Sequence, residues 1–222
     1  MNRLSDLNIS NQNLVIRVDM NVPIEDGVVT DNTRILACMP TIKFAQKSNA
    51  KILLVTHLGR PKEGTFDKKF SLKPVATEVS KILDHEVDLI DNLDSTKIFN
   101  GSSDIQILEN IRFFEGEKSN CNKLGKSLSS LGDIYVFDAF GTSHREQSST
   151  HSAILRRSHV ALINSFCARI GHSRIDTSQI QRICRQRSHA RKKYLSLGGH
   201  TWAGGTGWPI GRQLSRIFLV GI

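Results

Sequence analysis

The sequence predicts an α/β fold, in which a parallel sheet is flanked by helices and followed by an irregular carboxy-terminal tail. Aliphatic runs such as AKILLVTH (residues 50–57) and DIYVFDAFG (residues 133–141) are typical of parallel strands that are covered on both faces. Segments with helical spacing of apolar residues separate these runs, and such alternation produces parallel βαβ units. Charge and residue usage change near residue 155, where we expect the folded region to end.

The first predicted strand is LVIRVDMNVP, residues 14–23, which Pro23 ends. Because side chains alternate across a strand, Arg17, Asp19 and Asn21 share one face, opposite the face that carries apolar side chains. One interpretation is an edge strand whose polar face is solvated. The other is that these polar side chains serve a ligand.

The elements that follow alternate between helix and strand. A helix is predicted within residues 28–49, where Asp31 or Asn32 supplies the cap. A second helix is expected at residues 72–83, with one apolar stripe made by Leu72, Val75, Ala76, Val79, Ile82 and Leu83. Short strands are expected at residues 86–90 and 104–108, a weaker helix at 122–131, and a further strand at 133–141.

Residues 155–222 differ in composition from residues 1–154. The first region contains 18 Lys and Arg against 20 Asp and Glu, whereas the second contains 12 against 1. The first region has 12 Lys and 6 Arg, and the second has 2 Lys and 10 Arg together with Trp202 and Trp208. We therefore predict a folded domain at residues 1–154 and a basic, aberrant tail at residues 155–222.

The sequence argues against several classes of protein. Its first residues lack the apolar core of a signal peptide, and no uncharged apolar run is long enough to span a bilayer. The cysteines form no CxxC pair, which argues against a zinc site or a disulfide framework; they are Cys38, Cys121, Cys167 and Cys184. We expect a cytoplasmic protein with reduced cysteines.

Polar side chains follow the predicted strands at their carboxyl ends. Asp19 and Asn21 end the first strand, and His57 ends the strand at residues 50–57. The carboxyl ends of parallel strands meet at one edge of a sheet, so we expect these side chains to face a common site. The arginines expected at the same edge are Arg34, Arg60, Arg112 and Arg145.

Such an arginine cluster fits a small, highly anionic ligand, because guanidinium groups match the geometry of carboxylates and phosphates. We expect a phosphorylated acid. Asp19 can orient an arginine or accept from a ligand hydroxyl, and Asn21 can do the latter without adding charge. Two alternatives stay open: the arginines are unrelated surface residues, and His57 is a histidine satisfied at a strand end.

Six motifs, in order along the chain, resemble those of the amino-terminal domain of phosphoglycerate kinase: RVDMNVP, THLGRP, LENIRF, GEK, DAFGTSHR and STH. The resemblance covers about residues 5–154, and both the motifs and their order are specific. It implies a Rossmann-like substrate domain that binds 3-phosphoglycerate, or the glycerate end of 1,3-bisphosphoglycerate, in a basic patch. It also implies a monomeric glycolytic kinase.

The resemblance also implies roles for residues of this sequence. Asp19 and Asn21 would contact the glycerate hydroxyl and carboxylate, and Arg34 would stabilise the transferred phosphoryl group. The substrate carboxylate is the nucleophile, so no enzyme base is needed. The expected substrate-binding residues are Asp19, Asn21, Arg34, His57, Leu58, Gly59, Arg60, Arg112 and Arg145, of which His57, Arg60, Arg112 and Arg145 would bind the phosphate.

Phosphoryl transfer in the family also needs a second domain, which binds magnesium ATP or ADP. After STHSAI the sequence departs from the family's pattern, and His200 stands where a GG-x-K pattern would provide a lysine. We therefore assign no nucleotide-binding element and expect this chain, as a truncated member, to be inactive alone. The change in composition leads to the hypothesis that residues from about 155 onward are translated out of frame, which reading the encoding DNA in the other two frames would test.

Two further function classes remain open. The basic tail, with its two tryptophans, could attract nucleic acid or another anionic surface, although basic composition alone provides no specific site. Residues 1–154 could instead act as a noncatalytic module that binds a glycerate phosphate. Deletion of the tail and a salt titration of RNA binding distinguish the first class from the enzyme.

Overall fold

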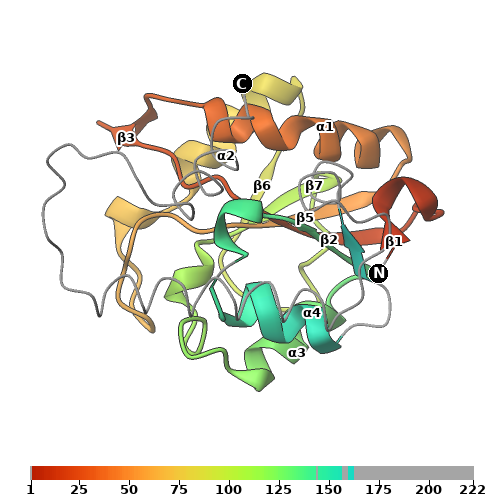
Figure 1. Ribbon diagram of the computed structural model, residues 1–222. Coiled ribbons are helices and arrows are strands. Elements are labelled where there is room, and N and C mark those ends of the chain that lie inside the picture. The colour runs from red at the N-terminus through yellow and green to blue at the C-terminus, as the bar shows by residue number, and fades with distance from the viewer. Residues whose placement is uncertain (1, 144, 157–159, 163–222) are drawn as a thin grey trace, which may run out of the picture. The chain divides into compact units, whose positions relative to one another are not determined.

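A seven-stranded sheet, in which every pair of neighbouring strands is parallel, forms the centre of the structure (Figure 1). The structure is a computed structural model, and it describes residues 2–143, 145–156 and 160–162. The strand order is β1-β9-β8-β2-β5-β7-β6. The predicted α/β class with a parallel sheet is therefore confirmed. The strands of the sheet are β1 (Asn2–Arg3), β2 (Asn13–Val18), β5 (Lys51–Val55), β6 (Asp88–Ile90), β7 (Ile105–Leu108), β8 (Ile134–Asp138) and β9 (Val160–Leu162), and a separate antiparallel hairpin joins β3 (Ile24–Glu25) to β4 (Val28–Val29).

Helices cover both faces of the sheet. Figure 1 shows α1 and α2 on one face, and α3 and α4 on the other. The three helices expected from apolar spacing are all present. The helices are α1 (Thr33–Lys47), α2 (Lys73–Leu83), α3 (Asn122–Ser130) and α4 (Ala153–Arg156), with short 3-10 turns η1 (Leu4–Asp6), η2 (Lys68–Phe70), η3 (Ile111–Phe113) and η4 (Phe140–Thr142) and a π-helical turn η5 (Ser148–Ser152).

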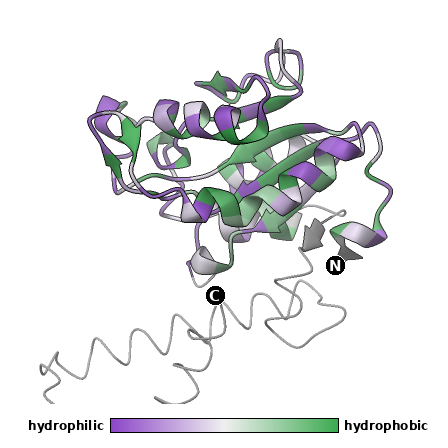
Figure 2. Cartoon of the chain, turned by 90° about the horizontal axis from the view of Figure 1, so that it is seen from above, coloured by the Kyte–Doolittle hydropathy of each residue, from purple (hydrophilic) through white to green (hydrophobic). Residues whose placement is uncertain are grey.

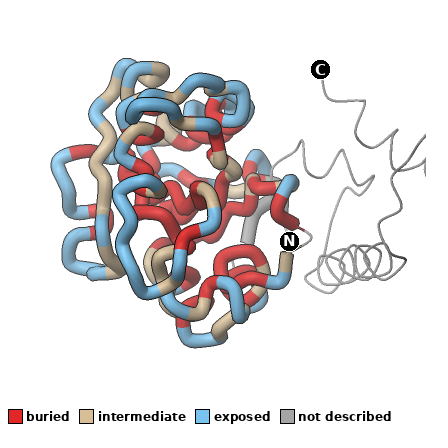
Figure 3. Tube along the Cα trace, turned by 90° about the vertical axis from the view of Figure 1, so that its left-hand side faces the viewer, coloured by how far each residue is buried: buried red, intermediate tan, exposed pale blue. Residues whose placement is uncertain are grey.

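Two apolar layers hold these helices against the sheet. Alternate residues of β2 contribute to different layers, so Ile16 packs with the residues of α1 and α2, and Val15 packs with those of α3 and α4. The strands are largely apolar in Figure 2, and the buried stretches of Figure 3 run through the sheet while exposed loops surround it. Sheets buried on both faces need such nearly continuous apolar strands, as the sequence predicts.

Two expectations about the first strand are wrong. β2 lies in the middle of the sheet between β8 and β5, so the edge-strand interpretation fails, and Arg17 is fully buried. The ladder ends at Val18 rather than at Pro23. Asp19 and Asn21 therefore belong to the loop beyond the strand, where their side chains no longer have to follow its alternation.

The sheet continues past residue 154. β9 pairs in parallel with both β8 and β1, and it follows a short helix, α4, that packs on α3. Residues 160–162 thus extend the ordered ladder beyond the predicted end of the domain. Most of the predicted tail, residues 163–222 with His200, lies outside the described residues.

Asn32 is the N-cap residue of α1, but its side chain makes no capping hydrogen bond. Asp31 accepts hydrogen bonds from the backbone N–H and the hydroxyl of Thr33, at 2.9 and 2.6 Å. Asn32 instead donates from Nδ2 to Oε1 of Glu78 on α2, at 2.9 Å. These contacts fix the first turn of α1, which carries Arg34.

In the part of the chain that the structure describes, no helix has the length and apolar character needed to cross a membrane.

Candidate functional site

The carboxyl ends of β2, β5, β7 and β8 lie at one edge of the sheet, because these strands are parallel. The chain leaves β2 toward α1 on one face, and it leaves β8 toward η5 and α4 on the other (Figure 1). In open α/β sheets, ligands bind where the connections from adjacent strands diverge in this way. The fold therefore places the candidate site between the segment that follows β2 and the segment that follows β8.

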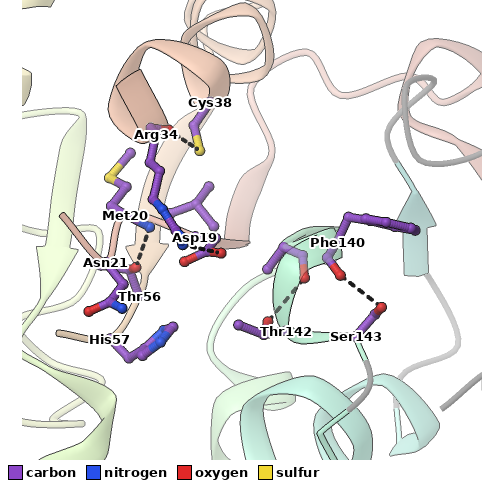
Figure 4. Close-up of polar contacts among 12 residues, drawn as sticks. Asp19, Met20, Asn21, Arg34, Cys38, Thr56, His57, Phe140, Thr142 and Ser143 are labelled. Atoms are coloured by element: carbon purple, nitrogen blue, oxygen red, sulfur yellow. Dashed lines mark hydrogen bonds and ion pairs between the residues drawn. The ribbon is translucent and has the colours of Figure 1, made fainter. Parts of the chain in front are cut away.

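Asp19 and Arg34 meet at this point (Figure 4). Nη1 of Arg34 lies 3.0 Å from Oδ2 of Asp19, with side-chain exposures of 54% and 16%. The other oxygen, Oδ1 of Asp19, is buried and has no hydrogen-bond partner among the described residues. Gly141 comes so close that a Cβ atom built on it would lie 2.7 Å from Oδ2 of Asp19, so a larger residue there would displace the Asp19 carboxylate.

His57 is buried beneath the same edge and contacts Arg17. Nη2 of Arg17 lies 3.3 Å from Nδ1 of His57, and His57 is 3% exposed. Burial, together with the guanidinium groups of Arg17, Arg112, Arg145 and Arg34, lowers the pKa of His57 to about 2. The imidazole is therefore neutral at physiological pH. It can donate a hydrogen bond to an anion but does not add a charge.

The segment after β5 is held by two asparagine side chains. Oδ1 of Asn21 accepts from the N–H of Gly59 at 2.8 Å, and Asn110 bonds both the N–H and the carbonyl of Leu58, at 3.2 and 2.8 Å. Gly59 has φ of +58°, and a Cβ atom there would lie 2.4 Å from the ring of Phe70. Asn21 thus shapes the backbone of the site in the unliganded chain.

Arg112 lies in η3, directly after β7, and is 4% exposed. Its Nη1 donates to the carbonyl of Gly59, while its Nε is buried without a hydrogen-bond partner among the described residues. Burial, followed by the charges of Arg145 and Arg17, lowers the pKa of Arg112 to about 10. A buried cation with an unsatisfied donor is costly unless an anion compensates it.

The electrostatics show that the arginines converge. The pKa of His57 is lowered by burial and by the charges of four arginines, which are Arg17, Arg112, Arg145 and Arg34. The charge of Arg60 also lowers the pKa of Arg112. These guanidinium groups repel one another because they carry like charges. The carboxylates of Asp19, which bonds Arg34, and of the buried Glu117, which acts on Arg17 and Arg112, offset part of this repulsion. The arrangement therefore favours a small, multiply charged anion at this edge.

Most of the predicted residues lie at this edge of the sheet. The charges of Arg34, Arg112 and Arg145 act on His57, and Asp19 and Asn21 lie in the loop that follows β2. Arg60 is exposed in the loop after Gly59, so it is free to move toward a ligand. Leu58 is buried, and its polar contribution is its backbone.

Three residues that support the site, Arg17, Ser149 and Glu117, are not among the predicted site residues. Arg17 bonds His57, Ser149 accepts from Nε of Arg17 at 3.0 Å, and Glu117 accepts from the Ser149 hydroxyl at 2.6 Å. Arg17 had a visible signal, because a charged residue in a buried strand requires a partner. Ser149 and Glu117 lie within the STH and GEK motifs, but nothing local in the sequence pairs them with Arg17, because their contacts span 132 and 32 residues.

Comparison with protein families matches residues 4–161 to the phosphoglycerate kinase family. Among curated proteins, the chain is 43% identical over 152 residues to the phosphoglycerate kinase of Desulfovibrio desulfuricans, an alignment that covers 68% of this chain and 39% of the relative. It is 45% identical over 153 residues to the enzyme of Nitratidesulfovibrio vulgaris, covering 68% of this chain and 38% of the relative. The chain thus spans about two fifths of the length of these relatives.

Solved structures agree in fold. The phosphoglycerate kinase of Coxiella burnetii superimposes with a TM-score of 0.71 at 37% identity, covering 76% of this chain and 43% of that one. The enzyme of Pyrococcus horikoshii gives a TM-score of 0.66 at 30% identity, covering 77% and 44%. The sequence and the fold both match an amino-terminal part of these kinases.

Proposed function

Because the chain belongs to the phosphoglycerate kinase family, we propose that its described domain binds 3-phosphoglycerate, or the glycerate end of 1,3-bisphosphoglycerate, at the carboxyl edge of the sheet. The observation that carries this proposal is the convergence of four guanidinium groups on a neutral, buried His57. Arg112, with its unpartnered Nε, lies among them. Each contact from such a group to a phosphate is charge-assisted and contributes about 1.5–3 kcal/mol.

The remaining polar groups fit the glycerate end of this ligand. Oδ1 of Asp19 is unpartnered and can accept from the hydroxyl group. Nδ2 of Asn21 can donate to the carboxylate while Oδ1 holds Gly59. Arg34 is half exposed beside Asp19 and would stabilise charge on the equatorial oxygens of the phosphoryl group during transfer.

Phosphoryl transfer itself would form a bond from a carboxylate oxygen of 3-phosphoglycerate, the nucleophile, to the γ-phosphorus of ATP. It would break the bond from that phosphorus to the β,γ-bridging oxygen, with ADP as the leaving group. Positioning and electrostatic stabilisation of the γ-phosphoryl group supply nearly all of the acceleration in this chemistry. The described residues contain no group of three or more His, Cys, Asp or Glu side chains that could hold a metal ion. We propose that this chain is cytoplasmic and monomeric, as the family resemblance implies. We also propose that it binds the acid substrate without turning over ATP, because His200 stands where the family's pattern would place a lysine for the nucleotide phosphates.

Calorimetric titration of the 222-residue chain with 3-phosphoglycerate tests the binding half. We expect Arg60→Ala to weaken binding roughly tenfold or more, because one charge-assisted contact is lost. Lys47→Ala removes a positive charge from an exposed position at the end of α1 and should leave the affinity unchanged. Equal affinities for the wild type and Arg60→Ala would contradict the site.

A coupled assay in both directions tests the catalytic half. We expect no steady turnover of ATP with 3-phosphoglycerate, or of ADP with 1,3-bisphosphoglycerate. Turnover that is proportional to the protein concentration and is lost in Arg34→Ala would show that the chain does bind a nucleotide productively. That outcome would refute the proposal that the chain is inactive.

A further inference from the structure

Arg17 is the most deeply buried cation of the candidate site. Its side chain has no exposed surface, and all three donor positions bond within the protein. Nε donates to Oγ of Ser149 at 3.0 Å, Nη1 donates to the carbonyl of Val18, and Nη2 lies 3.3 Å from Nδ1 of His57. Arg17 therefore does not reach a ligand. Its contacts show instead how it can act through His57.

A second layer of hydrogen bonds fixes the guanidinium group. Ser149 donates to Glu117 twice, from its hydroxyl to Oε1 at 2.6 Å and from its backbone N–H to Oε2 at 3.0 Å. The hydroxyl proton of Ser149 is thereby committed to Glu117, and its lone pairs face Nε of Arg17. The hydroxyl of Tyr135, on β8, donates to the carbonyl of Ser149 at 2.6 Å, which anchors η5 against the sheet.

This network determines which nitrogen of His57 carries the proton. A guanidinium group has donors and no acceptor, so Nδ1 of His57 must accept from Arg17. The neutral ring then carries its proton on Nε2. Nε2 makes no hydrogen bond to another described residue, so its proton is available for a ligand.

We propose that Arg17 is a positioning residue, which Ser149 and Glu117 hold in place and which fixes His57 as the Nε2–H tautomer that donates to the bound anion. The tautomer follows from the contacts of the unliganded chain, whereas the identity of the anion rests on the proposed function. Without Arg17, the ring has no partner that selects one tautomer. The donor would then face the ligand for only part of the time.

Two-bond ¹H–¹⁵N correlation spectra of the ¹⁵N-labelled 222-residue chain test the tautomer directly, with His57→Gln to assign the signals. We expect a neutral Nε2–H ring between about pH 5 and 8, without ligand. A neutral Nδ1–H ring, a mixture of tautomers, or an imidazolium in this range would overturn the proposal. This measurement on the wild type requires no variant to fold.

Arg17→Lys tests the positioning role, because lysine keeps the charge but replaces the planar fork by a single point donor. We expect a mixture of His57 tautomers and a roughly tenfold loss of affinity for 3-phosphoglycerate. Ser149→Ala, which leaves Arg17 in place without its Nε acceptor, should shift the His57 signals in the same direction by less. Signal dispersion equal to that of the wild type identifies a folded variant.

Arg60→Ala distinguishes the positioning role of Arg17 from the ligand site itself. It should lower the affinity for 3-phosphoglycerate while His57 stays in the Nε2–H form. If Arg17→Lys is folded and His57 keeps the Nε2–H tautomer, the positioning role is wrong, although the ligand site stands. If neither Arg60→Ala nor His57→Gln changes the affinity, the proposed ligand site is wrong, whatever the tautomer.

Discussion

Nη1 of Arg34 donates to Oδ2 of Asp19 at 3.0 Å, which ties the first turn of α1 to the segment that follows β2. A positive charge in the first turn of a helix opposes the helix dipole. Asp19 offsets this unfavourable placement and keeps the guanidinium group at the edge of the sheet. Its second oxygen, Oδ1, stays buried and unpartnered among the described residues, ready to accept from a ligand hydroxyl.

Asp19→Asn should weaken the binding of 3-phosphoglycerate by tenfold or more, because it removes both the carboxylate acceptor and the anchor of Arg34. Titration calorimetry measures the change. Asp26→Asn is the matched control, since Asp26 is exposed in the β3–β4 turn with φ of 49°, a conformation that asparagine tolerates. Equal losses in the two variants would show that net charge, rather than the Asp19 contact, determines the affinity.

Arg112→Met should stabilise the unliganded chain and abolish its response to 3-phosphoglycerate. Arg112 is a buried cation with an unpartnered Nε, surrounded by other arginines, and replacing such a group by an apolar one of similar size gains about 1 kcal/mol or more. Thermal unfolding with and without ligand measures both effects. Arg60→Met, at an exposed position, should give no such gain in stability.

A rise in the unfolding temperature of Arg112→Met that is matched by Arg60→Met would contradict the electrostatic explanation. So would an Arg112→Met variant that the ligand still stabilises as much as the wild type. Functional sites commonly contain residues that lower stability in this way.

The sequence was sufficient to predict the parallel sheet, because parallel strands that are buried on both faces consist of continuous aliphatic runs such as residues 50–57. It also led to the expectation that the arginines lie at the same edge as His57, since parallel strands bring their carboxyl ends together, and the charges of Arg34 and Arg112 do act on His57. That these side chains bind a common ligand stays a prediction. The hairpin β3–β4 and the strands β1 and β9 were not predicted. Each has two or three residues, too few for alternation to show.

The supporting layer of the site lay beyond sequence reasoning for a different reason. Arg17 was visible as a polar residue in an apolar strand, but a polar face is compatible with both an edge strand and a buried network. The position of β2 between β8 and β5 decides between them, and strand order is a tertiary property. Ser149 and Glu117 belong to the STH and GEK motifs, but only the fold shows that Ser149 bonds both Arg17 and Glu117.

His57 should make the stability of the chain depend on pH. Its pKa falls from the ordinary value of 6.5 to about 2 in the folded chain, so as pH falls below 6.5 the unfolded state takes up a proton that the folded state does not bind. This contribution to stability is complete above pH 6.5 and is lost at up to about 1.4 kcal/mol per pH unit below it.

Urea unfolding of the wild type and of His57→Gln between about pH 8 and 5 measures this dependence. The difference in unfolding free energy between the two proteins should be constant above pH 7.5 or so and should shrink as the pH is lowered through 6.5. A constant difference over the whole range would mean that His57 titrates alike in the folded and unfolded chains, and the burial argument would be wrong.

Gly59→Ala should lower both stability and affinity, because a Cβ atom at this position meets two obstacles. The backbone has φ of +58°, which costs an L-residue about 1–2 kcal/mol, and the new atom would lie 2.4 Å from the ring of Phe70. Relief of the clash would move the N–H that bonds Asn21 and the carbonyl that accepts from Arg112.

Gly27→Ala measures the free-energy cost of a positive φ without a clash, since Gly27 has φ of +76° and a Cβ atom there would meet nothing within 4 Å. Urea unfolding should show a loss of about 1 kcal/mol for Gly27→Ala, with unchanged affinity for 3-phosphoglycerate, and a larger loss for Gly59→Ala. The additional loss of unfolding free energy in Gly59→Ala arises from the clash with Phe70, so a smaller side chain at position 70 should restore part of it. The double variant Gly59→Ala with Phe70→Leu should therefore be more stable than Gly59→Ala alone. Equal losses in the two glycine variants would show that the ring of Phe70 moves aside without cost, and that the geometry of the segment after β5 does not depend on this contact.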